Sequence, residues 1–272
     1  MKASARIVAE ADGRGGTKLV VLRGESPLLL RRTGPRRTDG AVTVHLVGGA
    51  AGPLRGDELR LDVEVGPGAR LDVRSVAASI ALPGRPAAPP SLLAIHATVA
   101  AGAALRWLPE PLIAAAGCHH LARTAVQVAA GGTLVWRDDL VCGRHGETSG
   151  DVRTDVTVRY AGATLYRHEL AVGPGAPGWS GAAVLGSSGA VPLGGGRAVG
   201  SVLFAGDDLP AKGPLGGDAA MMPLAGPGIL AIAVGADIRQ VQTALAPVIR
   251  ADLVRLTPDF RSETHKIAGA IR

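Results

Sequence analysis

One pattern of apolar and polar positions occurs three times in this chain, over residues 63–73, 97–107 and 126–136. In each copy, apolar residues two positions apart stand on both sides of a central glycine. A period of two places these side chains on one face of a strand, and the glycine permits a tight turn. A looser fourth copy, residues 156–165, has one extra residue in its turn. Repeats about thirty residues apart are typical of stacked supersecondary units, so the pattern predicts a β-rich layered or solenoidal body.

The rest of the chain fits an all-β fold, β-helix-like, with a short C-terminal helical part. We expect further strands within residues 6–32, 42–46 and 229–234 and a loop over 83–90. Residues 173–200 and 207–227 are expected to form either long connections or sets of short edge strands. Asp237 precedes an apolar stripe at helical spacing, so it is expected to cap a helix that Pro247 kinks or shortens. The polar tail, residues 257–272, is expected to become ordered only on a partner. No linker separates two domains.

Composition narrows the function classes. Hydrophobic residues make up 47% of the chain and aromatics only 3%, so the core must be aliphatic. No phosphate-binding loop and no nucleophile elbow is present, which argues against the common nucleotide-binding and hydrolase classes. No apolar run reaches the length of a membrane span and no secretory signal is evident, so a soluble cytoplasmic protein is expected. Few lysines and aromatics argue against nucleic acid as a partner.

The net charge of +6 is concentrated at one end. Residues 1–37 hold nine Lys/Arg against three acids, and the other 235 residues hold twenty of each. The excess includes two arginine pairs, Arg31–Arg32 and Arg36–Arg37. These arginines are either a contact surface for an acidic partner or charges that discourage an edge strand from pairing with another chain.

Cysteine and histidine gather in two places that suit nickel, zinc or copper. Cys118, His119 and His120 are consecutive, and Cys142 lies close to His145. Neighbours on a strand face opposite sides, however, and neither group has the spacing of a structural zinc site. We therefore expect ordinary polar residues here more than a tight metal site. A Cys142–His145 nucleophile pair is a third alternative, although no group that would orient it is evident.

Other candidate side chains have ordinary structural explanations from the sequence alone. Asp57, Glu147 and Glu169 stand at turns or strand ends, where surface carboxylates are common. His168 shares a strand face with Tyr166 and Leu170, which favours a hydrogen-bonded core histidine.

Several stretches, taken in their order and spacing, resemble the UreD (UreH) family of urease accessory proteins. The resemblance runs collinearly from about residue 3 to 255, so residues 1–272 are treated as a single UreD-like domain. It is carried by residues 26–32, 52–69, 107–113 and 143–147 and by the closing helix.

The resemblance implies a non-catalytic subunit with a β-helix-like fold that docks with UreF and the GTPase UreG on apo-urease. It implies no tightly bound cofactor, only a transient nickel ion that passes through a water-filled tunnel. Asp57, Glu147 and Glu169 fall on acidic positions of the family and are therefore predicted to line that tunnel, with His168 and Ser75 as further candidates. Residues 75–80 depart from the family pattern, and Ser75 is the one residue transferred from that stretch. A β-solenoid that bridges partners without handling metal is the alternative.

Overall fold

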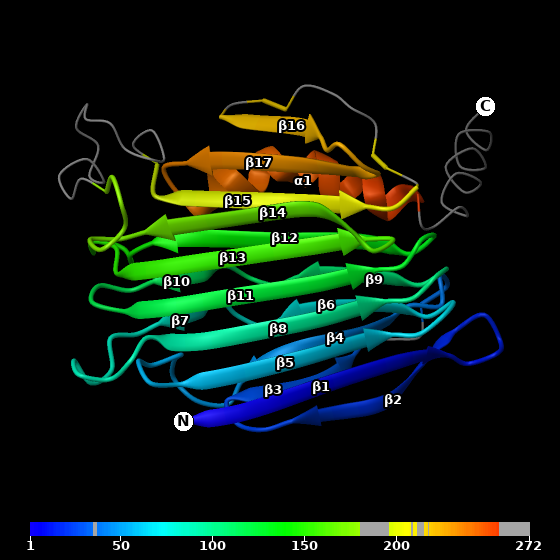
Figure 1. The fold of residues 1–272 in the computed structure, drawn as a ribbon, viewed down its shortest axis with the longest axis horizontal. Coiled ribbons are helices and arrows are strands. Elements are labelled where there is room, and N and C mark those ends of the chain that lie inside the picture. The colour runs from blue at the N-terminus through cyan, green and yellow to red at the C-terminus, as the bar shows by residue number, and fades with distance from the viewer. Residues whose placement is uncertain (35–36, 180–195, 208, 211–214, 217, 256–272) are drawn as a thin grey trace, which may run out of the picture.

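A computed structural model describes residues 1–34, 37–179, 196–207, 209–210, 215–216 and 218–255. Within this part of the chain the strands form two sheets that lie face to face (Figure 1). The first sheet has seven strands, in the order β14 (Ala163–Val172), β13 (Asp151–Tyr160), β11 (His119–Val128), β8 (Ser91–Val99), β5 (Glu58–Val65), β1 (Lys2–Ala11) and β2 (Thr17–Gly24).

The second sheet has ten strands. Its main path runs β16 (Ala219–Pro223), β17 (Gly228–Gly235), β15 (Ala198–Ala205), β12 (Thr133–Cys142), β9 (Ala104–Leu108), β6 (Arg70–Ser75), β4 (Val42–Gly48) and β3 (Leu28–Thr33). The short strands β7 (Ser79–Ala81) and β10 (Leu112–Ala114) pair beside this path. The all-β, stacked-sheet prediction is confirmed.

Each of the three regular repeats crosses from one sheet to the other at its glycine. The first half lies in the seven-stranded sheet as β5, β8 or β11, and the second half lies in the ten-stranded sheet as β6, β9 or β12. Equivalent strands of successive repeats pair in parallel. The repeat therefore encodes an arch between sheets, and stacked arches give the body its β-helix-like character.

The arch glycines have backbone angles that disfavour any other residue. Gly68, Gly102 and Gly131 have φ values of +71°, +69° and +74°, within the left-handed region. The Gly102 N–H donates to the Gly131 carbonyl at 3.0 Å. In the last arch the Gly131 N–H donates instead to the Tyr160 hydroxyl, also at 3.0 Å. Tyr160 therefore caps the stack of arches.

The fourth copy folds differently because of its extra residue. Ala161 and Gly162 have φ values of 49° and 84°, as in the type I′ turn that joins antiparallel strands. Strands β13 and β14 accordingly form a hairpin within the seven-stranded sheet. Among the described residues, Ala161 is the only non-glycine with a positive φ.

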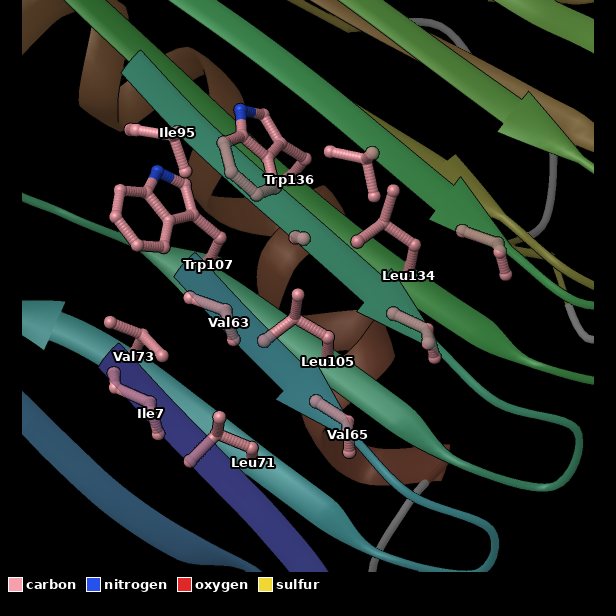
Figure 2. Close-up of a cluster of buried hydrophobic side chains, with 14 of the residues drawn as sticks. Ile7, Val63, Val65, Leu71, Val73, Ile95, Leu105, Trp107, Leu134 and Trp136 are labelled. Carbon is pink, nitrogen blue, oxygen red and sulfur yellow. The ribbon is translucent and has the colours of Figure 1, made fainter. Parts of the chain in front are cut away.

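Aliphatic side chains of the repeats fill the space between the sheets at the arch end (Figure 2). The side chains of Leu71, Leu105 and Leu134 come from three successive arches and are 0–1% exposed. The indole rings of Trp107 and Trp136 stack behind them with centroids 4.8 Å apart. The core is aliphatic with a few large rings, as the composition predicts.

The C-terminal helix α1 (Ile238–Arg255) covers the outer side of the ten-stranded sheet (Figure 1). The Asp237 carboxylate accepts the Gln240 N–H at 2.9 Å, which confirms the predicted cap. Val241 and Leu245 are fully buried against β15 and β17. Of the two effects predicted for Pro247, a kink or a shortening, the structure excludes the shortening, because the helix continues past it to Arg255. Packing of this apolar face outweighs one lost backbone hydrogen bond.

Four strands were not placed individually by the sequence prediction: the short strands β7 and β10, and the strands β15 and β16. Strand β15 begins at the end of the segment 173–200, and β16, an edge strand, lies inside 207–227. Long connections or short edge strands were the alternatives for both segments. Their sequences, AVGSVLFA for β15 and AAMMP for β16, do not alternate apolar with polar residues, yet both strands pair with β17. The predicted tail, residues 257–272, and residues 180–195 lie outside the described residues.

Candidate functional site

A cavity of about 550 Å³ lies between the two sheets, on the side of the tryptophan pair away from the arches. Its wall is largely apolar. The titratable and hydroxyl side chains that it contains include those of Ser75, Glu110, His120, Thr124, Asp138, Asp139, Tyr166, His168 and Ser201.

The cavity is lined by the strand residues that flank each repeat copy. On the C-terminal side, the residues two positions after each copy line it, and these are Ser75, Pro109 and Asp138. On the N-terminal side, the residues two positions before each copy line the cavity from the facing sheet, and these are Leu61, Ile95 and Thr124. Small or polar side chains at several of these positions leave the volume open, whereas the repeat positions themselves are packed.

Asp138 is a half-buried carboxylate in this wall. The Trp136 indole N–H donates to it at 2.8 Å. Burial raises the pKa of Asp138 to about 6, despite the hydrogen bond from Trp136, and the charge of Asp139 adds to the rise. Burial and the Asp138 charge also raise the pKa of Tyr166 to about 12. Asp138 therefore changes charge near pH 6 at the boundary of the cavity.

His120 faces the same cavity from β11 of the opposite sheet. Its side chain is 0% exposed, and its Nδ1 lies 2.9 Å from the Ser91 hydroxyl oxygen. Burial lowers the pKa of His120 to about 4, so the imidazole is neutral at physiological pH. Its Nε2 is buried and has no hydrogen-bond partner among the described residues.

Two of the five predicted tunnel residues lie in the cavity wall. The Ser75 hydroxyl donates to the Ala77 carbonyl and accepts the Glu110 N–H at 2.8 Å. His168 also lines the cavity and stacks on Tyr166, with ring centroids 6.0 Å apart. The expectation of a core histidine is wrong, because β14 is an edge strand and leaves His168 exposed.

The three predicted carboxylates lie outside this wall. Asp57 accepts the Met1 amino group at 2.8 Å and the Leu54 N–H at 2.9 Å. Glu147 accepts the Arg144 guanidinium in a surface turn, and this hydrogen bond lowers the pKa of Glu147 to about 2. Glu169 is 54% exposed on the outer face of β14, because it alternates with the inward His168.

The cysteines and the remaining histidines do not come together. Cys118 and Cys142 are buried, and burial raises the pKa of both thiols to about 11. Cys142 and His145 do not form the suggested nucleophile pair, since the imidazole is exposed and the protonated thiol is buried. Within the part of the chain that the structure describes, no group of three His, Cys, Asp or Glu is placed to hold a metal ion.

Comparison with known proteins decides the family. The model of the UreD urease accessory protein family matches residues 1–265. The urease accessory protein UreD 3 of Streptomyces griseus subsp. griseus is 46% identical over 258 residues, which cover 92% of this chain and 96% of that protein. The urease accessory protein UreD of a Parafrankia species is 40% identical over 284 residues, covering 95% and 92%. The chain belongs to the UreD family. This membership supports a role in urease maturation.

The basic residues predicted as a partner surface have different surroundings in this UreD-family structure. Arg31 and Arg32 are exposed on β3, an edge strand, as both a partner surface and the protection of an edge require. Arg37 is instead engaged within the chain, where it donates to Asp72 at 2.8 Å and to Asp39 at 2.6 Å. Arg36 lies outside the described residues.

Sequence reasoning missed Asp138 and chose His120 only as part of a cysteine–histidine cluster. A signal for both was present: extending the alternation beyond each repeat places Asp138 on the inward face of β12. No helix in the described part of this UreD-family chain is long and apolar enough to cross a membrane.

Proposed function

We propose that this protein is a scaffold and nickel-conducting subunit of urease maturation, which docks with UreF and UreG on apo-urease in the cytoplasm. Nickel is its transient cargo, and no cofactor is held tightly. The observation that carries the proposal is the cavity between the sheets, with Asp138 in its wall. Membership of the UreD family gives the system in which this cavity would operate.

The physical requirements of cation passage support this assignment. Moving a divalent ion into dry protein costs on the order of tens of kcal/mol, so its route must contain water and oxygen or nitrogen ligands. A cavity of about 550 Å³ has room for several waters, each of which occupies about 30 Å³ in the liquid. Asp138, Glu110 and Ser75 supply oxygen ligands along the wall.

Passage also requires that the ion be released. A closed set of thiolate and imidazole ligands would retain nickel, whereas one or two ligands with water allow exchange. The described residues contain no set of three, which agrees with transit through the cavity. We accordingly assign the acidic role of the route to Asp138 in place of Asp57, Glu147 and Glu169.

The test is to co-express urease with UreF, UreG and variants of this chain, and then to measure nickel per urease. Asp138→Asn removes the charge but keeps an oxygen for the Trp136 N–H. We expect intact complexes and a nickel content that falls toward the level reached without this chain. Glu169→Gln, on the outer face, is the matched control and should behave as wild type. Wild-type nickel content with Asp138→Asn would favour the alternative of a bridging protein that handles no metal.

A further inference from the structure

The surroundings of His120 determine which of its ring nitrogens carries the proton. Ser91 stands beside His120 in the parallel ladder of β8 and β11. Its hydroxyl oxygen is 2.9 Å from His120 Nδ1 and 3.3 Å from the His119 carbonyl oxygen, to which it donates. A hydroxyl has one proton, so both contacts form together only when Nδ1–H donates to the Ser91 oxygen.

This arrangement leaves Nε2 with a free lone pair. The atom is buried, has no hydrogen-bond partner among the described residues, and belongs to a side chain that lines the cavity. Metal-binding histidines in proteins show the same arrangement, in which the second ring nitrogen donates to a fixed acceptor that sets the tautomer and the ring orientation. The histidine is thus held in the tautomer and ring orientation that a metal ligand requires.

We propose that His120 Nε2 is a nitrogen ligand that makes this cavity selective for borderline divalent metals such as nickel, and that Ser91 is its positioning residue. This deepens the proposed function, on which it rests for the identity of the cargo.

The selectivity follows from ligand chemistry. Carboxylates, hydroxyls and water suit magnesium and calcium as well as transition metals, so a wall with oxygen ligands alone would discriminate poorly. Imidazole nitrogen favours nickel, copper and zinc over those abundant ions. A single imidazole, with no set of three ligands around it, also binds weakly enough to release the metal.

The neighbouring histidine offers a matched control. His119 has the same side chain and the adjacent position, but alternation along β11 turns it to the opposite face. His120→Asn keeps a polar atom near the Ser91 hydroxyl and removes Nε2, and His119→Asn makes the same change outside the cavity. Equal thermal unfolding of both variants would show that the fold is retained.

The first experiment titrates the full chain with Co²⁺ and Ni²⁺ in competition with Mg²⁺, and follows cobalt ligation by paramagnetic NMR. We expect the wild type and His119→Asn to show one shifted imidazole, and His120→Asn to lose it together with roughly tenfold in affinity relative to Mg²⁺. If His120→Asn destabilises the fold, His120→Gln is the second variant. Wild-type cobalt affinity and selectivity in a folded His120 variant would overturn the proposal.

The second experiment tests Ser91. Nitrogen-15 NMR of the metal-free protein should show the Nδ1–H tautomer of His120, and Ser91→Ala should lose this preference and weaken Co²⁺ binding by roughly tenfold. Ser91→Thr, which restores a hydroxyl, should rescue both. An Nε2–H tautomer in the wild type would contradict the assignment. If a His120 variant loses metal selectivity but urease is activated normally, the proposed function is refuted and the site stands. If the variant keeps its metal selectivity but urease is not activated, the site alone is refuted.

Discussion

The two ends of the space between the sheets are built from the same strands but differ in content. At the arch end, Leu105, Leu134 and their neighbours are fully buried in a close-packed aliphatic core (Figure 2). At the other end, the continuations of these strands surround a cavity that contains Asp138 and His120. The repeated pattern covers the first region and stops where the second begins.

This difference shows how one architecture can serve stability and function separately. Stacked arches supply packed apolar contacts and turn hydrogen bonds, which do not depend on pH. The cavity end carries ionisable groups removed from bulk water, which stabilise or destabilise the fold according to their charge. Variants at the arch end should therefore shift stability equally at all pH values, whereas variants of the ionisable residues at the cavity end should not.

The largest expected effect is the loss of a core leucine at the arch end. Leu105→Ala should lower the free energy of unfolding by about 3 kcal/mol, because it leaves a void in a packed region. Leu59→Ala, in the wall of the cavity, should cost only about 1–2 kcal/mol, since Leu59 already borders open space. Urea denaturation measures both. Equal losses would mean that the cavity end is packed as tightly as the arch end.

The next prediction concerns Asp138, whose pKa of about 6 lies above that of an unfolded aspartate. The folded protein then binds this proton more readily than the unfolded chain, so stability falls as pH rises from about 4 to 6 and is constant above. Asp138→Asn removes this loss and should be more stable than wild type at pH 7 by about 1–3 kcal/mol.

Denaturation between pH 4 and pH 8 checks this prediction, and the two curves should converge at the acidic end. Glu169→Gln should leave the pH profile unchanged. A destabilised Asp138→Asn at pH 7 would show that the ionised carboxylate has a stabilising partner. Increased stability together with reduced nickel transfer would identify Asp138 as a residue kept for function at the expense of stability.

Most of the fold could be predicted from the sequence, and the site largely could not. The alternation around Gly68, Gly102 and Gly131 reports backbone geometry and burial directly, so the stacked strands were predictable. Which carboxylate faces inward depends on register, and a shift of one residue reverses the outcome, as His168 and Glu169 show. That β14 returns as an edge strand depends on one extra turn residue, whose effect the sequence alone did not reveal.

A smaller effect should follow from removing the cap of the arches. Tyr160→Phe deletes the hydroxyl that accepts the Gly131 N–H and should lower stability by about 1 kcal/mol, since this N–H can still reach water. The loss should be the same at pH 5 and pH 8, unlike that at Asp138. Hydrogen exchange of the Gly131 amide should accelerate in the variant. Unchanged exchange would show that the hydroxyl does not protect this turn.

The smallest effect distinguishes the hairpin turn from the arch turns. Ala161 has a φ of 49°, and alanine in this left-handed region costs about 1–2 kcal/mol, which exceeds the entropy that glycine loses on folding. Ala161→Gly should therefore raise the free energy of unfolding by about 0.5–1 kcal/mol.

Ala130 offers the matched control. It precedes Gly131 in the last arch just as Ala161 precedes Gly162, but its φ is not positive. Ala130→Gly should consequently lower stability by about 0.5–1 kcal/mol. Opposite signs for these two substitutions, measured in parallel denaturation curves, follow only if the extra residue of the fourth copy changes the turn type, and equal signs would contradict that explanation.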